Sequence, residues 1–221
     1  MIRNAADRDE GLVRITAGEV VLEGNLVIPP GATGVVLFAH GSGSGRFSSR
    51  NRYVAEQLRT GGAGTLLIDL LTREEEQADM RTAHLRFDIG LLADRLVRTI
   101  EWLEREPQTR NLKVGLFGAS TGGGAALAAA ARRPDRVAAV VSRGGRPDLA
   151  GPALPHVRAP TLLIVGGDDI PVIGMNREAY DQMKSERRLE IVPGASHLFE
   201  EPGTLEEVAR LARQWFQQYL R

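Results

Sequence analysis

The pentapeptide Gly118-Ala119-Ser120-Thr121-Gly122 has the G-x-S-x-G pattern that can present a nucleophilic serine. In this pattern a strand turns sharply into a helix, and the serine side chain is left exposed at the tip of the turn. A short apolar run precedes Ser120 and a helix-forming run of small residues follows it, which is the context that this interpretation requires. The pattern therefore predicts that Ser120 is a catalytic nucleophile. A glycine-rich turn without chemistry is the alternative.

A serine nucleophile needs a general base, and the chain contains 4 histidines. We predict that His197 is this base, because it alone lies C-terminal to Ser120 in a loop after the last predicted strand. The order Ser, Asp, His requires that position. A histidine that only caps the last helix is the alternative. His40 follows a predicted strand, and we expect it to be structural, bracing the loop after it.

Two carboxylates, Asp168 and Asp169, compete for the role of orienting His197, since both follow the predicted strand 161–165. We favour Asp169, because it lies further into the loop and is freer to turn toward the imidazole. Asp168 is then expected to bond backbone amides of its own turn, as Asp commonly does.

The developing oxyanion needs fixed hydrogen-bond donors. We expect these to be the backbone N–H groups of Thr121, directly after the nucleophile, and of Ser42, in the glycine-rich loop 40–45. That loop is not a dinucleotide fingerprint, because Arg46 stands where G-x-G-x-x-G needs its third glycine. Neither glycine cluster has the G-K-[ST] ending of a P-loop, so we expect no nucleotide cofactor.

Composition excludes several classes of function. The 221 residues contain 28 basic and 28 acidic side chains, and this balance argues against a nucleic-acid partner. There are no cysteines, which excludes disulfides, thiolate metal sites and a cysteine nucleophile, and we expect no metal. No apolar stretch is long enough to span a membrane, and residues 1–7 lack the apolar run of a signal peptide. We therefore expect one cytoplasmic domain over residues 1–221, without a membrane partner.

The elements around these motifs predict an α/β fold. Residues 12–28 alternate as an antiparallel hairpin, and a shorter run at 189–192 would be an outer strand. Continuous apolar runs indicate parallel strands covered by helices on both faces, at 34–39, 65–68, 112–117, 137–141 and 161–165. Helices are predicted along the apolar stripe 85–103, at 121–132, at 174–187, and after a capping-box spacing at Thr204 and Glu207. The acidic run 74–76 is expected to be a solvated loop or a helix start.

Taken together, His40-Gly41, Gly118-x-Ser120-x-Gly122, Gly166-x-x-Asp169 and His197 resemble the motifs of α/β-hydrolases. The short loops resemble the dienelactone-hydrolase branch, from about residue 20 to the end. This resemblance implies a doubly wound, mostly parallel eight-stranded sheet, no cofactor, and the triad Ser120–Asp169–His197. Dienelactone hydrolases proper place cysteine where this chain has Ser120, so the resemblance favours a serine ester hydrolase. A thioesterase, a lactonase, an acyltransferase and a catalytically idle binding module are the alternatives.

The substrate is expected to be a small-molecule ester, because residues 142–160 are too few for a helical lid or cap domain. Arg143 follows the predicted strand after the nucleophile and could bind a carboxylate or phosphate of that substrate through two hydrogen bonds. The alternative is that Arg143 pairs with Asp148 or another loop carboxylate. Arg46, in the loop on the oxyanion side, could add to the positive charge at this substrate site. The alternative is that Arg46 is simply exposed on the surface. The oligomeric state cannot be read from the sequence.

Overall fold

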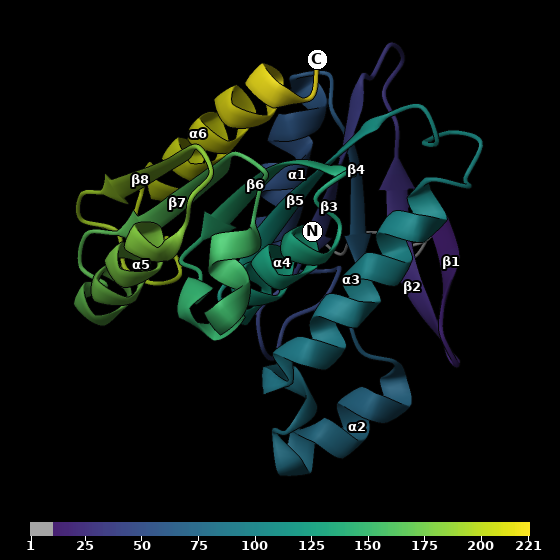
Figure 1. Cartoon of the computed structure of the whole chain (residues 1–221), viewed down its shortest axis with the longest axis horizontal. Helices are drawn as coiled ribbons and strands as arrows, with labels where there is room; N and C mark the ends of the chain where they lie inside the picture. Colours follow the sequence, from purple (N-terminus) through teal and green to yellow (C-terminus); the bar gives the residue numbers. More distant parts are fainter. Residues whose placement is uncertain (1–10) are drawn as a thin grey trace.

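A computed structural model describes residues 11–221 of the chain. Residues 1–7, on which the expected absence of a signal peptide depended, lie outside the described residues. The described chain forms one eight-stranded sheet in the order β1-β2-β4-β3-β5-β6-β7-β8 (Figure 1). Its strands are β1 (Leu12–Ala17), β2 (Val20–Val27), β3 (Gly34–Ala39), β4 (Gly64–Ile68), β5 (Lys113–Ala119), β6 (Val137–Arg143), β7 (Thr161–Gly166) and β8 (Arg187–Val192).

The sheet is parallel from β4 to β8, while β1 and β2 pair antiparallel with each other and β2 pairs antiparallel with β4. This confirms the predicted mostly parallel sheet with an antiparallel N-terminal hairpin. Every residue of β3, β4 and β7 is buried, as expected for parallel strands covered on both faces.

Helices cover both faces of the sheet. They are α1 (Ser49–Thr60), α2 (Arg73–Thr82), α3 (Ile89–Leu103), α4 (Thr121–Arg132), α5 (Ile170–Gln182) and α6 (Thr204–Tyr219), with 3₁₀ segments η2 (Leu85–Phe87) and η3 (Pro147–His156). The core on one face is formed with α3 and α4, and the core on the other face with α1 and α6 (Figure 1). No described helix is long and apolar enough to cross a bilayer.

Three helix starts differ from the prediction. The stripe 85–103 is not one helix, because the Asp88 side chain accepts the Leu91 N–H at 2.9 Å and starts α3 there. The weakly predicted helix 174–187 is α5, which begins earlier, at Ile170. The capping box at Thr204 is wrong: Gly203, at φ 83°, caps α6, and the Thr204 hydroxyl donates to the Glu201 carbonyl at 2.7 Å.

The connection between β6 and β7 contains only the short η3, so no cap domain is inserted there, as predicted. A different segment reaches beyond the sheet edge: α2 and η2, between β4 and α3, project away from the body of the molecule (Figure 1). The acidic run 74–76 forms the first turn of α2, which confirms the helix-start interpretation. Thr72 and Glu75 form a capping box at this start, each side chain bonding the other residue's backbone N–H.

Candidate active site

Ser120 lies in a strained turn between β5 and α4. Its backbone has φ 51° and ψ −123°, in the left-handed half of conformational space that residues other than glycine rarely adopt. The flanking glycines are required by packing. A Cβ on Gly118 would lie 2.5 Å from the Gly122 carbonyl oxygen, and one on Gly122 would lie 2.2 Å from the Ala39 carbonyl oxygen. The pentapeptide thus forms the sharp strand-to-helix turn that its sequence predicts.

His197 and Asp169 are joined by a hydrogen bond between Nδ1 and Oδ2, at 2.7 Å. The bond places the donated proton on Nδ1 and leaves Nε2 as the free ring nitrogen. Asp168 is exposed, and its carboxylate has no hydrogen bond within residues 11–221. Its backbone N–H donates to the Ala195 carbonyl at 3.0 Å. The expectation that the Asp168 carboxylate bonds its own turn is therefore wrong, and Asp169 is the carboxylate beside the imidazole.

The end of β6 contacts both Ser120 and the His197 loop. The Ser120 N–H donates to the Arg143 carbonyl at 3.3 Å. A Cβ on the next residue, Gly144, would lie 3.0 Å from the His197 carbonyl oxygen and 3.7 Å from His197 Cε1. Residues 143–144 therefore hold the serine turn and the histidine loop against the same short stretch of backbone.

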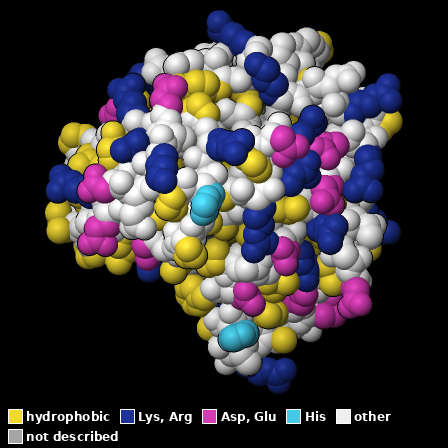
Figure 2. Space-filling model, in the orientation of Figure 1, with side chains coloured by type: hydrophobic (Ala, Val, Ile, Leu, Met, Phe, Trp, Pro, Cys, Tyr) yellow, Lys and Arg dark blue, Asp and Glu magenta, His cyan; other side chains and the backbone are white. Residues whose placement is uncertain are grey.

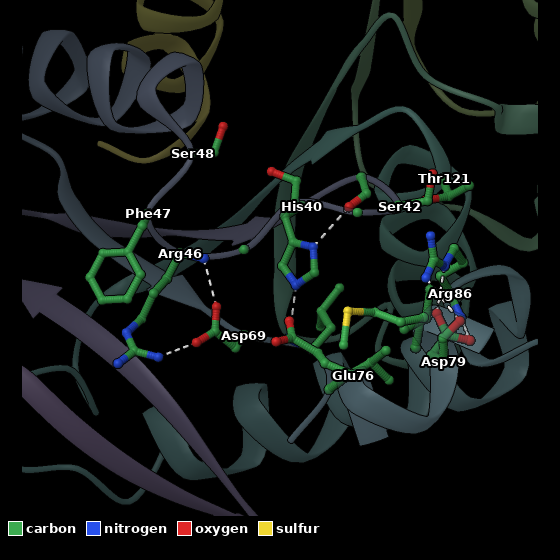
Figure 3. A pocket seen from close by; sticks show the side chains of 18 of the residues that line it. His40, Ser42, Arg46, Phe47, Ser48, Asp69, Glu76, Asp79, Arg86 and Thr121 are labelled. Carbon is green, nitrogen blue, oxygen red and sulfur yellow. Dashed lines mark hydrogen bonds and ion pairs between the residues drawn. The ribbon is translucent and has the colours of Figure 1, made fainter. Parts of the chain in front are cut away.

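The loop that follows β3 lies against the serine from the other side. A Cβ on Gly41 would lie 3.0 Å from Ser120 Cβ, so the backbone of this loop approaches the nucleophile closely. Ser42, the next residue, and Thr121 line one cavity of about 710 Å³ (Figure 3). The two expected oxyanion donors thus border the same cavity, and their role as donors stays a prediction.

His40 is a structural histidine, as predicted. Its Nδ1 donates to the Gly41 carbonyl and its Nε2 accepts the Leu70 N–H, each at 2.9 Å (Figure 3). Burial lowers the pKa of this imidazole below its ordinary value of 6.5, which keeps it neutral in both bonds. Because Leu70 follows β4, His40 ties the loop after β3 to the neighbouring strand end.

Arg46 lines the same cavity, but two carboxylates hold it. Its backbone N–H donates to Asp69 Oδ1 at 2.7 Å, its guanidinium pairs with Asp69, and Nη2 pairs with Glu23 at 2.7 Å (Figure 3). Arg46 is buried, so plain surface exposure is the wrong alternative. A substrate-binding role for Arg46 stays a prediction, and any such role must act through a charge that is already paired.

Arg143 has no carboxylate partner for its guanidinium among residues 11–221. It is 6% exposed, and its Nη2 donates to Asn51 Oδ1 of α1 at 3.3 Å. Its guanidinium carbon lies 5.8 Å from the ring centroid of Phe199, in the His197 loop. Asp148, the expected alternative partner, pairs instead with Arg146, at 2.7 and 2.8 Å. Burial, and then the charge of Arg50, lower the pKa of Arg143 to about 10, so it remains charged at neutral pH.

The sequence analysis missed three residues here. Asn51 of α1 bonds Arg143. Met80 and Glu76 of α2 line the cavity, and Figure 3 shows Glu76. A signal for α2 was present, since Thr72-x-x-Glu75 has the capping-box spacing. Burial raises the pKa of Glu76, and the charge of Asp69 adds to this shift. Within residues 11–221, no group of three or more His, Asp or Glu side chains is arranged to hold a metal ion.

Comparison with known proteins identifies the family. The model of the dienelactone hydrolase family matches residues 22–220. The chain belongs to this family. The crystal structure of a dienelactone hydrolase from Anabaena variabilis is 68% identical and superposes with a TM-score of 0.94, covering 95% of this chain and 97% of that one. Est1E from Butyrivibrio proteoclasticus, 15% identical, shares the fold with a TM-score of 0.79, covering 95% and 98% of the two chains.

Curated relatives from Mycobacterium tuberculosis are named "Putative phosphoribosyl transferase" and are 56% identical over 213 residues. The match covers 96% of this chain and 47% of theirs, so the chain spans about half the length of the curated relatives it matches. The predicted α/β-hydrolase fold and dienelactone-hydrolase resemblance are confirmed. A single domain over residues 1–221 stays a prediction.

Proposed function

We propose that this family member is a serine hydrolase of carboxylic esters that works through an acyl-enzyme on Ser120. The observation that carries the proposal is the strained turn at Ser120, held against the loop of a histidine that is bonded to Asp169. These are the parts that nucleophilic acyl transfer needs: a nucleophile, a base and a group that orients the base.

In the proposed reaction the Ser120 hydroxyl oxygen bonds to the ester carbonyl carbon, and its proton passes to His197 Nε2. Asp169 holds Nδ1–H and stabilises the imidazolium. The oxyanion takes hydrogen bonds from the N–H groups of Ser42 and Thr121. The bond from carbon to the leaving oxygen then breaks, and His197 returns the proton to the leaving alcohol. Water repeats the sequence on the acyl-enzyme and releases the carboxylic acid.

The cavity beside the loop after β3 suits a small organic ester. Its lining combines buried apolar side chains, Leu71 and Leu92, with the exposed side chains Phe47 and Met80 at its rim. Met80 is 72% exposed, a state that a bound apolar group would relieve. The proposal therefore places the apolar part of the substrate between α2 and the loop after β3. A thioester or a lactone would use the same residues.

The test is active-site labelling beside kinetics. A fluorophosphonate probe should label the wild type at one serine, and Ser120→Ala should remove the label and lower kcat on the order of 10³-fold or more. Ser185→Ala, a serine far along the chain between α5 and β8, is the matched control and should label fully. A panel of p-nitrophenyl esters, thioesters and lactones ranks the substrate classes. Undiminished turnover in Ser120→Ala would end the proposal, and failure of every substrate together with the probe would favour an idle binding module.

A further inference from the structure

The guanidinium of Arg143 is a buried cation without a counterion. No carboxylate within residues 11–221 comes within 4.0 Å of it, and its Nε has no hydrogen-bond partner there. Its one hydrogen bond is the 3.3 Å contact of Nη2 with a neutral amide oxygen, that of Asn51. Leaving a buried charge uncompensated is costly, so the site favours any anion that can reach it.

The bond to Asn51 places this guanidinium at the first turn of α1. The N-terminal end of a helix carries partial positive charge, and its first amides have no partner within the helix. Proteins usually put acidic side chains there, but the first turn of α1 contains none, and it carries Arg50 and Arg52. Ser48, which caps this helix, also lines the cavity beside the nucleophile. The Arg143 guanidinium from β6 and the first turn of α1 therefore meet at Asn51, and Ser48 joins this helix start to the cavity.

The acidic groups nearby do not cancel this charge. Glu200 pairs with Arg50 at 3.0 Å, on the exposed side of the loop, with 63% of its side chain exposed. Glu201 accepts the Ser196 N–H at 3.0 Å within the His197 loop. Over the wider surface, Lys and Arg are interspersed with Asp and Glu (Figure 2). The local excess of positive charge at Arg143 is thus a property of this site and not of the whole molecule.

We propose that Arg143 and the first turn of α1 bind a phosphate group carried by the ester substrate. The donors come from different elements: the guanidinium edge from β6, the N–H groups of Ser49 and Arg50 at the start of α1, and the hydroxyl hydrogen of Ser48, whose oxygen already accepts the Asn51 N–H at 3.4 Å. A tetrahedral dianion with three free oxygens can use all of them, whereas one arginine fork already satisfies a planar carboxylate. Because the Arg143 carbonyl accepts the Ser120 N–H, the phosphate would lie within one small molecule's length of the nucleophile.

This inference rests on the proposed ester hydrolysis, and the experiment separates the two. Three acetate esters of matched size are compared: 2-acetoxyethyl phosphate, 3-acetoxypropanoate and the neutral 2-methoxyethyl acetate. For the wild type, kcat/KM should be highest for the phosphate ester, by about 10- to 100-fold over the neutral one. Arg143→Met should reduce this preference to less than about 3-fold; the readout is the ratio of kcat/KM between the phosphate and the neutral ester, in which a loss common to all the esters cancels. Arg146→Met, whose arginine is paired with Asp148, is the matched control and should keep the preference.

Asn51→Asp is a second variant, which keeps the shape of the site and gives Arg143 a carboxylate partner. It should also lose the phosphate preference, so the test survives if Arg143→Met does not fold. Equal losses on all three esters would show that Arg143 only positions the Phe199 loop and would overturn the proposal. A carboxylate ester that matches the phosphate ester would overturn it as well.

Binding of inorganic phosphate, followed by ³¹P line broadening, is measured beside the kinetics. Broadening that is lost in Arg143→Met, with no ester hydrolysed, would uphold the anion site and refute the proposed function. Hydrolysis of neutral esters without phosphate binding would support the proposed ester hydrolysis and refute the phosphate site.

Discussion

The packing of the serine turn predicts opposite effects for the same substitution in two helices. In Gly122→Ala the new Cβ would lie 2.2 Å from the Ala39 carbonyl oxygen and 2.6 Å from the His40 carbonyl oxygen. Both are backbone atoms at the end of β3, so neither can rotate away, and α4 must shift. Overpacking of this kind costs about 1–3 kcal/mol, and so short a contact puts it near about 3 kcal/mol. Replacing a helical glycine returns about 1 kcal/mol, so the net loss should be about 2 kcal/mol.

Gly174→Ala is the matched control. Gly174 lies inside α5, and no atom lies within 4 Å of the position of its Cβ. The alanine should therefore stabilise the protein by up to about 1 kcal/mol. The two variants should differ by about 3 kcal/mol, which corresponds to roughly 6–12 °C in Tm for a chain of this size. Calorimetry or urea unfolding measures this difference.

Activity provides the second readout for Gly122→Ala. A shift of α4 moves the Thr121 N–H relative to Ser42, and a misplacement of about 1 Å can cost on the order of 10²-fold in rate. Gly174→Ala should retain wild-type kcat. If Gly122→Ala unfolds at the wild-type temperature with full activity, the close approach between the serine turn and the loop after β3 is not what fixes the site.

Asp169→Asn should fold normally and lower kcat roughly 10²- to 10⁴-fold, because the imidazole tautomer is no longer held. Asp168→Asn, at an exposed position, should change neither kcat nor Tm. If Asp168→Asn lost activity and Asp169→Asn did not, the assignment would be reversed. Burial lowers the pKa of His40 below 6.5, so below that pH the unfolded chain binds more protons than the folded one. Stability should then fall as the pH drops below 6.5, by at most about 1.4 kcal/mol per unit, and urea midpoints for His40→Gln should be flatter over pH 5–6.5. Glu75→Ala removes both the α2 capping box and the partner of buried Arg95, and urea unfolding should show a loss of about 2–4 kcal/mol. Glu75→Gln, which can still cap, should lose less, and equal losses would mean that the cap contributes nothing.

The sheet and the order of the site residues could be predicted because each depends on a local pattern. A continuous apolar run fits a strand covered on both faces, and parallel strands bring their carboxyl ends to one edge. The registers Ala39 with Gly118 and Ala119 with Arg143 place those ends level. Gly118 likewise reflects a steric requirement within five residues, because a Cβ there would meet the Gly122 carbonyl. Gly122 is part of the same local pattern, but its steric reason is the close approach of the loop after β3, which the sequence does not show.

The helix starts show where local patterns stop being sufficient. The spacing Thr-x-x-Glu occurs at 72–75 and at 204–207, and only the first forms a capping box. At the second, Gly203 adopts φ 83° and is the cap in place of Thr204, so Thr204 is already the first residue of α6. Its hydroxyl donates to the Glu201 carbonyl. The two starts satisfy different backbone groups, because side chains bond N–H groups at α2, whereas at α6 the Thr204 hydroxyl bonds a carbonyl. The four-residue spacing contains no information on the conformation of the residue before it, which decides the second case.

The partners of the arginines could not be read from the sequence at all. Arg46 finds Glu23 and Asp69, which lie 23 residues away on either side, while Arg146 pairs two residues along the chain with Asp148. Arg143 ends a central strand, and its neighbours in register are the apolar Ala119 and Ile164. No adjacent strand can therefore supply a carboxylate at its level. Within residues 11–221 the contacts of the guanidinium are a neutral amide, from α1, and an aromatic ring, from the His197 loop. The place of Arg143 in the sheet thus explains why its charge has no carboxylate beside it among the described residues, and this is the reason why we propose a substrate phosphate as its counterion.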